Sequence, residues 1–539
     1  MALKAIEQYS KQFQASFLRR QGDEKIRKMA QKVSQAAITK PGVKPVIFFN
    51  ASTRLGGKSL NAAYSLLTAW GLRLQGVPVV HFVCQRGMSR CVLGTNRDDV
   101  KKALPCDKCV RHSQAEYDRA NTYWFTYQEE TSLRNLIQGL SVEALMLLRY
   151  EDIPLGEIVL PALRWELRKH RLNDDESTRF LYREFILSAW NIGQEFGKLL
   201  DEVDPQCVVV FNGQFFPEAM VRYLCMGKGI RVITHEVGMM PHTAFFTDGE
   251  ATAYPMDIPE DFELNEVQNL RLDEYLSNRF QGNFKMAGIQ FWQGMKRLDP
   301  AFIQMISNFR QVVPIFTNVI FDTSQPHSNV LFPDMFTWLA EMKAVFQKHP
   351  DTLFVIRAHP DELRPGSAKQ SRETVRDWVQ NQQIPDLANV VFVDATEYIS
   401  SYELIQKSKF VLVYNSSIGL EASIMGKPVL AAGRSRYTGY PTVFFPKTAQ
   451  EYWNTLEDFL NQTEIRVPEE HSRQARRLLY YQLYRTAIPF GAYLTDSHRP
   501  GLVMLKDFDV GALQVENSHT MQVLTGGILK GTPFIVEES

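Results

Sequence analysis

Short apolar runs alternate with amphipathic stretches along most of the chain. In the first half, the apolar runs are typical of buried strands, and the stretches between them have helical spacing. The strand-like segments are 44–52, 77–83, 206–213 and 230–238, and the clearest helical ones are 59–76, 113–200 and 215–229. This alternation predicts a parallel sheet flanked by helices.

A second series of the same kind begins near residue 300. Its strand-like segments are 312–322, 352–362, 389–394, 409–417 and 427–433, and its helical segments are 335–350, 371–383 and 398–408. Two sheets of the nucleotide-binding type in one chain predict two α/β domains with a cleft between them. In such sheets ligands bind at the carboxyl ends of the strands.

The breaks between these series predict four parts. They are an N-terminal helix at 1–40, a first α/β domain with a helical insertion at 41–295, a second α/β domain at 296–465 and a helical tail at 466–539. A chain of 539 residues is long enough for two or three domains of ordinary size.

Charge and apolar run length narrow the class of protein. Lys and Arg together number 60, as do Asp and Glu, which argues against a bulk nucleic-acid binder. The chain contains no run of eighteen uninterrupted apolar residues, so no membrane-spanning helix is predicted. The first 35 residues form an amphipathic, basic pattern rather than a signal peptide. We expect a cytoplasmic protein. The basic helix either docks on its own domain or touches a partner or the inner face of a membrane.

The stretch "YNSSIGLE" follows a predicted strand of the second series. Ser416 or Ser417 can cap the helix that starts there, beside Asn415, and free helix amides attract phosphate. Gly419 would let a ligand approach the backbone. A capping box needs an acidic residue three positions after the cap, and the residues three positions after Ser416 and Ser417 are Gly419 and Leu420. Glu421 therefore does not complete a capping box. We expect the carboxylate of Glu421 to accept the hydroxyls of a ribose, with a structural glutamate as the alternative.

Two further strand ends in the same series carry suitable donors. "FVIRAHPDE" leaves Arg357 and His359 at the carboxyl edge of its strand, and both side chains suit phosphate oxygens. Thr317 and Asn318 follow the first strand of the series and form a weaker phosphate-loop pattern. A structural histidine at 359 is the alternative.

These motifs together carry a family resemblance. "RAHP" and "VDATEYISSYELIQKSKFVLVYNSSIGLEASIMGKPVLAAGRSRY" resemble the C-terminal half of bacterial capsule-polysaccharide glycosyltransferases, including the capsular Kdo transferases. The resemblance is best over 354–437, and 211–238 resembles their acceptor domain more loosely. It implies the GT-B fold, two Rossmann-like domains facing across a cleft, and a nucleotide-sugar at His359, Ser416, Ser417 and Glu421.

The resemblance also bears on substrates. The same half is similar to CDP-glycerol glycerophosphotransferases, and both families use a cytidine nucleotide. The resemblance therefore implies a nucleotide-sugar donor, CMP- or otherwise cytidine-linked, and a glycan or lipid-linked glycan acceptor. "YNSSIGLEAS" departs from the Thr-Ser and aromatic pattern of the Kdo enzymes, which leaves the donor sugar open. Besides a glycerophosphotransferase, a nucleotide-sugar-binding subunit without activity remains an alternative.

Catalysis by such an enzyme needs a positioned acceptor and, for inversion, a base. "THEVG" ends a strand of the first series, so His235 or Glu236 could deprotonate the acceptor hydroxyl; a solvated strand-end pair is the alternative. His235 is favoured because an unperturbed imidazole titrates near neutral pH. No Asp-x-Asp motif stands out, so the sequence requires no catalytic metal and no cofactor.

Two other motifs give competing predictions. "NASTRLGGKSLN" nearly matches a phosphate-binding P-loop with Lys58, but Ser52 stands where the pattern needs glycine, so an NTPase is the rival class. Four cysteines, Cys84, Cys91, Cys106 and Cys109, have the spacing C-x6-C-x14-C-x2-C and could hold structural zinc or an iron–sulfur cluster. Ordinary buried thiols are the alternative for these four residues.

Overall fold

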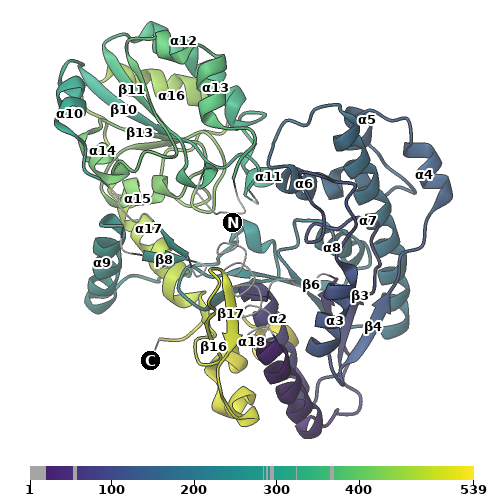
Figure 1. Ribbon diagram of the computed structural model, residues 1–539. Helices are drawn as coiled ribbons and strands as arrows, with labels where there is room; N and C mark the ends of the chain where they lie inside the picture. Colours follow the sequence, from purple (N-terminus) through teal and green to yellow (C-terminus); the bar gives the residue numbers. More distant parts are fainter. Residues whose placement is uncertain are drawn as a thin grey trace, which may run out of the picture.

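The computed structural model describes residues 20–51, 57–282, 284–286, 289–291, 296–322, 324–363 and 370–538. Two lobes, each built on a sheet, meet along one side, with α11 (Gln325–Ser328) of the second lobe beside α6 (Leu155–Leu167) of the first (Figure 1). Trp165 and Phe321 pack edge to face across this contact. Within the described residues, no helix is both long and apolar enough to cross a membrane.

The first lobe is built on a seven-stranded sheet. Its strands lie in the order β15-β7-β6-β5-β1-β3-β4. They are β1 (Val46–Asn50), β3 (Val79–Cys84), β4 (Asn121–Phe125), β5 (Cys207–Phe211), β6 (Arg231–Val237), β7 (Thr243–Thr247) and β15 (Ile488–Pro489). The five strands from β4 to β6 are parallel, whereas β7 and β15 extend the β6 edge in antiparallel pairing. By chain position the parallel strands follow the order 3-2-1-4-5 of a Rossmann sheet.

Helices cover both faces of this sheet. They are α2 (Leu60–Leu74), α3 (Cys106–Glu116), α4 (Thr131–Ile137), α5 (Val142–Met146), α6, α7 (Glu176–Val203) and α8 (Glu218–Gly227). The side chains of Ser59 and Asp175 cap α2 and α7 by accepting hydrogen bonds from backbone amides, which fixes where each helix begins. The stretch 113–200, predicted as mostly helical, also contains β4. This strand escapes the pattern because its outer residues are only partly buried.

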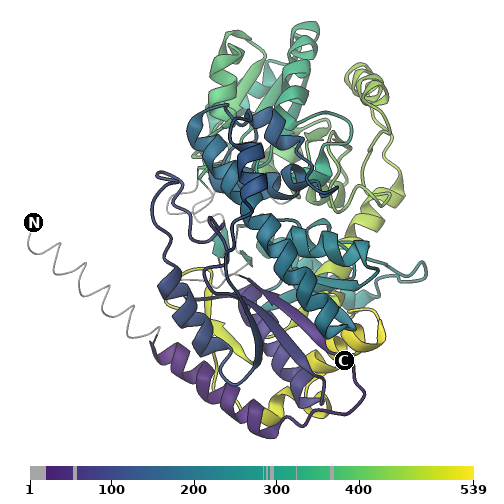
Figure 2. The same cartoon turned by 90° about the vertical axis from the view of Figure 1, so that its right-hand side faces the viewer.

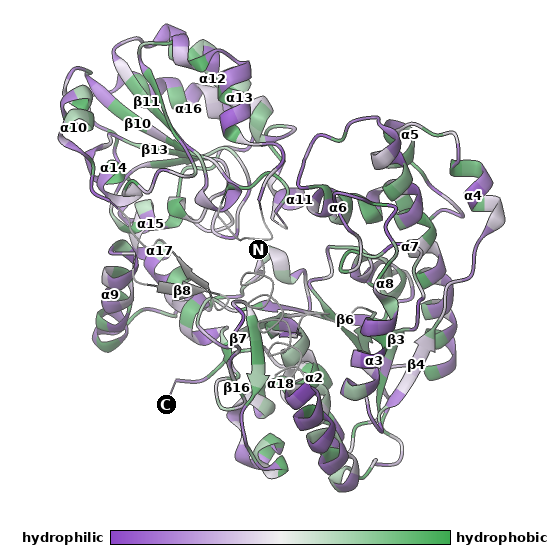
Figure 3. Cartoon of the chain, viewed as in Figure 1, coloured by the Kyte–Doolittle hydropathy of each residue, from purple (hydrophilic) through white to green (hydrophobic). Residues whose placement is uncertain are grey.

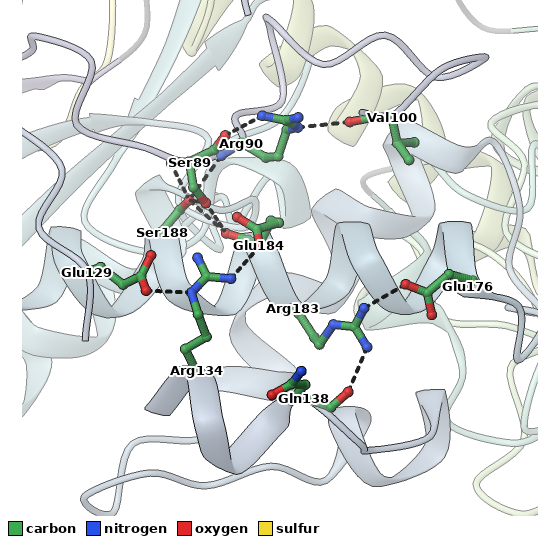
Figure 4. A network of polar contacts seen from close by, with 10 residues as sticks. All are labelled: Ser89, Arg90, Val100, Glu129, Arg134, Gln138, Glu176, Arg183, Glu184 and Ser188. Atoms are coloured by element: carbon green, nitrogen blue, oxygen red, sulfur yellow. Dashed lines mark hydrogen bonds and ion pairs between the residues drawn. The ribbon is translucent and has the colours of Figure 1, made fainter. Parts of the chain in front are cut away.

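Polar contacts fasten the predicted helical insertion onto α7 (Figure 4). Arg134 of α4 donates to Glu184 at 3.0 Å and pairs with Glu129 at 2.9 Å. On the next turns of α7, the Ser188 hydroxyl accepts from the backbone amide of Ser89 at 3.0 Å. The loop after β3 and the short helix α4 are therefore held to one long helix rather than to each other.

The second lobe is built on a five-stranded sheet in the order β12-β11-β10-β13-β14. Its strands are β10 (Gln311–Phe316), β11 (Thr352–Arg357), β12 (Val390–Val393), β13 (Val411–Val413) and β14 (Val429–Ala431). All pairs are parallel, and the order is again 3-2-1-4-5. The helices around it are α10 (Pro300–Ser307), α12 (Met335–Lys348), α13 (Val375–Asn381), α14 (Ser401–Lys407), α15 (Ile418–Ile424) and α16 (Ala449–Asn461).

The hydropathy pattern explains how this lobe closes on its sheet. Hydrophobic residues run through β11 and β13, and hydrophobic and hydrophilic residues alternate along α12 (Figure 3). Every residue of β10 and β11 is buried, as expected for central strands covered on both faces. The predicted α/β class with two Rossmann-like domains is confirmed.

Two helices outside the sheets join the lobes. Helix α9 (Glu266–Phe280) and helix α17 (Glu469–Tyr480) share an apolar cluster with both lobes, to which α9 contributes Leu272 and Leu276. Val312 and Val355 of the second sheet lie in the same cluster, as does Phe245 of the first. Helix α9 therefore packs under the second lobe, although the predicted domain division places it in the first.

The segment after α17 returns to the first lobe. Strand β15 pairs with β7, and β16 (Leu494–Asp496) pairs with β17 (Leu502–Leu505), which pairs with β2 (Lys58–Ser59). Helix α18 (His519–Lys530) packs on α2, and Figure 2 shows this yellow segment beside the purple elements of the first lobe. The predicted helical tail 466–539 thus contains three strands, each too short to leave a period-two pattern. Residues 20–36 are helical as predicted; residues 1–19 of the predicted N-terminal helix lie outside the described residues.

Candidate functional site

Six of the nine side chains predicted to hold a nucleotide line one pocket of the second lobe. They are Thr317, Arg357, His359, Ser416, Ser417 and Glu421. They follow β10, β11 and β13, whose carboxyl ends meet where the strand order reverses between β10 and β13. This is the position at which open parallel sheets bind ligands. Arg279, Ser401 and Tyr402 complete the polar part of this second-lobe pocket.

Arg357 carries the main charge of the second-lobe pocket. Its side chain is 3% exposed, and Nη1 donates to the Asp394 carbonyl at 2.5 Å. Nε and Nη2 are buried and have no hydrogen-bond partner in the described part of the chain. Burial lowers the pKa of Arg357 to about 10, so the guanidinium still carries its charge at neutral pH. A buried cation with two unsatisfied donors is costly, and an anion in the pocket would relieve that cost.

His359 lies at the turn after β11. Its Nδ1 accepts from the Asp361 amide at 3.2 Å and so caps the short 3-10 helix η2 (Pro360–Glu362). The neutral ring then has its proton on Nε2, which makes that nitrogen a hydrogen-bond donor. Beside it, the Thr317 hydroxyl donates to the Arg357 carbonyl at 3.0 Å and ties the ends of β10 and β11 together.

The predicted serine cap of α15 is wrong. Ser417 precedes the helix with φ −60° and ψ −19°, which is helical rather than extended, and its side chain makes no capping hydrogen bond. The hydroxyl therefore does not lie over the first amides of α15. Both Ser416 and Ser417 line the second-lobe pocket instead, and the Ser416 carbonyl accepts from the Tyr437 hydroxyl at 2.6 Å.

Gly419 does not open the backbone to a ligand. A Cβ atom there would lie 2.4 Å from the Tyr437 hydroxyl and 3.1 Å from Val413. The absent side chain therefore makes room for Tyr437, a fully buried residue, within the protein core. This corrects the predicted role of Gly419, which is not among the residues that line the second-lobe pocket.

Asn318 and Asn415 also differ from the prediction. The Asn318 amide donates to the Asn415 side-chain oxygen at 2.7 Å, and Asn415 donates to the Ser328 hydroxyl at 2.5 Å. Both asparagines are buried and lie outside the pocket lining. They join the loops after β10 and β13 and hold α11 in place, so they support the pocket from behind.

Glu421 does line the second-lobe pocket, but its carboxylate already has partners. Arg279 donates to Oε1 at 2.6 and 2.8 Å, and the Tyr402 hydroxyl donates to Oε2 at 2.5 Å. A ribose would have to share this carboxylate or displace a partner. The sequence analysis missed Arg279. This residue continues the buried stripe of Leu272 and Leu276 along α9, and a cation in an otherwise apolar stripe is the signal that could have identified it.

A second pocket occupies the equivalent place in the first lobe. It lies at the carboxyl ends of β1, β5 and β6, on either side of the point where the strand order reverses. Its polar lining comes from Asn50, Ser59, Asn61, Ser65, Glu116, Tyr117, Glu218 and His235. This first-lobe pocket encloses about 810 Å³ against about 420 Å³ for the second-lobe pocket, in both cases counting space open to solvent.

His235 lines the first-lobe pocket, but its protonation differs from the expectation. Burial lowers the pKa of His235 to about 3. The ring is therefore neutral at physiological pH and a weak base, so the argument from near-neutral titration fails. Nδ1 lies 3.3 Å from the Asn61 oxygen, which makes Nδ1 the donor and leaves the ring's acceptor position at Nε2.

Glu236 is occupied with structural hydrogen bonds. Its Oε1 accepts from Asn61 at 2.9 Å and from its neighbour Val237 at 2.8 Å, and Oε2 accepts from Asn212 at 3.2 Å. These contacts tie α2, β5 and β6 together at the sheet edge. Glu236 is not part of the pocket lining, which corrects its placement as a base facing the cleft.

Glu218 is a titratable pocket residue that the sequence analysis missed. It is the first residue of α8, directly after the turn that follows β5, and it is 7% exposed. Burial raises the pKa of Glu218 to about 8. The only sequence signal is "FFPE" after a strand, and an acidic residue in the first turn of a helix is too common to single out.

The lysine of the near-match to a P-loop is engaged inside the protein. Residues 52–56, including Ser52, lie outside the described residues. Lys58 is 5% exposed and forms a buried ion pair with Glu116, and it lies in strand β2, directly before Ser59, the N-cap residue of α2. A P-loop lysine must reach phosphates, whereas this amine is already neutralised inside the protein.

Comparison with known proteins gives one family match. Residues 316–459 match the family described as "Capsule polysaccharide biosynthesis protein". The matched segment starts in β10 and ends in α16, so it contains all of the second-lobe pocket except Arg279. Among curated proteins, none matches the chain.

Several solved structures are similar at low identity. KpsC of Thermosulfurimonas dismutans, a "beta Kdo 2,7 transferase", is 16% identical with a TM-score of 0.33, and the match covers 58% of this chain and 85% of that one. Sucrose-phosphate synthase of Thermosynechococcus elongatus is 11% identical with a TM-score of 0.27, covering 81% and 95%. Over residues 316–459 the second lobe is similar to the capsule polysaccharide biosynthesis family, which confirms the resemblance predicted from the sequence for this half of the chain.

Proposed function

We propose that the protein is a glycosyltransferase of capsule polysaccharide assembly that binds a nucleotide-sugar donor in the second-lobe pocket. The observation that carries this proposal is Arg357, a buried guanidinium with two unsatisfied donors at the carboxyl edge of a Rossmann sheet. The family match over the same lobe supports it. A cytidine-linked donor and a glycan or lipid-linked glycan acceptor remain part of the proposal, as does action at the cytoplasmic face of the membrane.

In this proposal, Arg357 binds the donor phosphate. Its Nε and Nη2 can form two charge-assisted hydrogen bonds, the geometry in which arginine recognises phosphate. The imidazole of His359 and the hydroxyls of Ser416 and Ser417 line the same pocket and would contribute further contacts to the donor. When the sugar leaves, negative charge grows on the phosphate, so a fixed cation there stabilises the transition state as well as the bound donor.

The first-lobe pocket would bind the acceptor. Its lining of amides, hydroxyls and carboxyls suits a sugar, which offers hydroxyl groups and no charge. Glu218 is our proposed general base, because a carboxylate with a pKa of about 8 can take a proton from the acceptor hydroxyl near neutral pH. The deprotonated oxygen then forms the new bond to the anomeric carbon as the bond to the nucleotide breaks.

The proposal is tested in two stages on the full chain. Calorimetry with CMP, CDP, UDP and GDP identifies the nucleotide base and shows whether a diphosphate is preferred, and Arg357→Gln should weaken binding of the preferred nucleotide by ~100–1,000-fold. Sugar-linked donors and CDP-glycerol are then incubated with glycan acceptors and analysed by mass spectrometry. Transfer of glycerol phosphate from CDP-glycerol would show that the protein is a glycerophosphotransferase rather than a glycosyltransferase. Binding without transfer to any acceptor would favour the non-catalytic subunit.

A further inference from the structure

Four cysteines from separate segments line a single small pocket of the first lobe. Cys84 ends β3, Cys91 lies in the following loop, and Cys106 and Cys109 lie in the first turn of α3. None of the four takes part in a disulfide, each is partly buried, and the rest of the pocket wall is mostly apolar. The sheet and the helix therefore bring together residues that are up to 25 positions apart in the sequence, as the spacing of the motif predicts.

A backbone amide points at one of the sulfur atoms, and the chain passes close to another. The Gly87 amide donates to Cys84 Sγ at 3.2 Å, and the Gly94 amide donates to the Cys91 carbonyl at 3.3 Å. A Cβ atom on Gly94 would lie 3.1 Å from the Cys91 sulfur, so the chain can come this close only at a small residue. An amide donor directed at sulfur is the kind of outer contact that orients thiolate ligands in metal sites.

The surroundings also carry positive charge. Arg86 lines the four-cysteine pocket and pairs with Asp107, beside Cys106 in α3. Arg90 donates to the carbonyls of Val100 at 2.8 Å and Lys101 at 3.0 Å, as Figure 4 shows in part, and so holds the loop between the second and third cysteines. Cations and fixed loop geometry both favour a site with four thiolates, which has a net negative charge when it holds a divalent ion.

We propose that Cys84, Cys91, Cys106 and Cys109 bind a thiophilic metal centre, either Zn²⁺ or an iron–sulfur cluster. Binding would replace four S–H bonds by four metal–sulfur bonds and release four protons. Among the described residues, no three His, Cys, Asp or Glu side chains already stand in a metal-binding arrangement. The metal must therefore draw the thiols together, and by doing so it would fasten the loop after β3 to the start of α3.

The first test measures metal in the full-length protein, purified without chelator under anaerobic conditions. We expect about one Zn²⁺ per chain by elemental analysis, or iron with acid-labile sulfide and a visible absorption band. The double variant Cys106→Ser/Cys109→Ser should lose that metal. The matched control is Cys225→Ser, which changes a buried thiol of the same lobe outside the pocket and should keep the metal content of the unchanged protein.

A second measurement needs no variant and so does not depend on folding of a mutant. In the unchanged protein, thiol blocking with a mercurial should release zinc in proportion to the thiols that react, detected with a colorimetric chelator. Metal below a tenth of one equivalent in fresh anaerobic protein would overturn the proposal. Mass-spectrometric detection of disulfides among the four cysteines in that same sample would overturn it as well, and would assign the pocket to thiol–disulfide chemistry.

Discussion

The two lobes place a pocket at the same point of the same strand order, yet the two pockets differ in charge. In the second lobe, Arg357 keeps two buried donors without partners. In the first, Lys58 is paired with Glu116, and Glu236 is satisfied by asparagine amides. Glu218 is left as a carboxyl that burial disfavours as an anion.

The difference shows that the strand order sets where a site lies, whereas the buried polar groups that lack hydrogen-bond partners determine which kind of ligand it binds. Polar groups buried without partners are rare in folded proteins, because each costs free energy that a ligand can return. The second-lobe pocket therefore needs an anion, whereas the first-lobe pocket is suited to an uncharged, hydroxyl-bearing molecule. Variants of the residues that distinguish the two pockets test this contrast.

The first prediction concerns Glu218 as the base. Glu218→Gln keeps the shape of the side chain but cannot accept a proton, so turnover should fall by roughly 10²–10⁴-fold with donor affinity unchanged. The rate of the unchanged enzyme should rise with pH as Glu218 ionises, around the pKa of about 8. Steady-state kinetics across pH 5–9 measures both.

His235 provides the comparison variant for this prediction. It lines the same pocket, but with a pKa of about 3 it should add no inflection near pH 6.5. If His235→Ala reduces turnover more than Glu218→Gln and removes the pH dependence, the imidazole is the base and the assignment of Glu218 is wrong.

The second prediction concerns Arg357. Arg357→Gln should weaken binding of a nucleoside diphosphate by ~100–1,000-fold, about 3–4 kcal/mol for two lost hydrogen bonds to a charged group. Binding of the uncharged nucleoside should change little. Because the ligand-free protein loses a buried unsatisfied cation, its melting temperature should stay equal or rise.

Arg310, an exposed arginine of the same lobe, is the matched control for this charge change, and Arg310→Gln should leave both affinity and melting temperature near those of the unchanged protein. A melting temperature that falls sharply in Arg357→Gln, with nucleotide affinity intact, would make Arg357 a structural residue and would remove the contrast between the pockets.

Much of this architecture could be predicted because apolar runs report buried strands directly. The strands of the second sheet are fully buried except for β12, whose two middle residues are partly buried, and the carboxyl ends of β10, β11 and β13 carried the motifs that line the pocket. By contrast, β4, β15 and β16 are short or partly exposed, and nothing in their patterns links residues 488–505 to the first lobe. Pairing across such a long stretch of chain is decided by packing rather than by local sequence.

The site could be predicted only in part for a related reason. The sequence shows which residues follow a strand, but not whether a neighbour already satisfies them. Asn318, Asn415 and Glu236 stand at strand ends as expected, yet each is occupied by other side chains. Arg279 comes from α9, beyond the predicted domain boundary. Gly419 serves Tyr437, a residue eighteen positions later whose contact has no local signature.

The third prediction concerns the pH dependence of stability. Burial raises the pKa of Glu218 and of Glu362 from 4.5 to about 8 in each case. Between these values the folded protein binds more protons than the unfolded chain, so the free energy of unfolding should fall as pH rises from about 4.5 to 8. Glu218→Gln removes one such group and should be more stable than the unchanged protein at pH 9, by ~2–4 kcal/mol, but not at pH 4.

Urea unfolding at pH 4 and pH 9 measures this difference. Glu464, an exposed glutamate of the second lobe, gives the control, since Glu464→Gln should show no such dependence on pH. Equal stability of Glu218→Gln and the unchanged protein at pH 9 would mean that water or a rearranged pocket solvates the carboxylate. Glu218 would then lose its rationale as a base with raised pKa.

The smallest expected effect separates two roles of Glu421. Its carboxylate anchors Arg279 and Tyr402 within the protein, and it also lines the nucleotide pocket. If it accepts a ribose hydroxyl as well, Glu421→Ala should weaken nucleotide binding by ~1–3 kcal/mol.

Loss of an anchor could lower affinity by the same amount, so the variant alone does not distinguish the roles. A 2′-deoxynucleotide does, because a ribose contact must show coupling: the deoxy ligand should bind the unchanged protein more weakly, and Glu421→Ala should then cost little further. Tyr402→Phe serves as the matched control, since it removes one hydrogen bond from the carboxylate without removing an acceptor for ribose. Equal losses of affinity for the ribose and deoxyribose ligands in Glu421→Ala would show that Glu421 acts through Arg279. In that case Glu421 keeps the Arg279 guanidinium paired at the edge of the pocket, so that it does not compete with Arg357 for the phosphate.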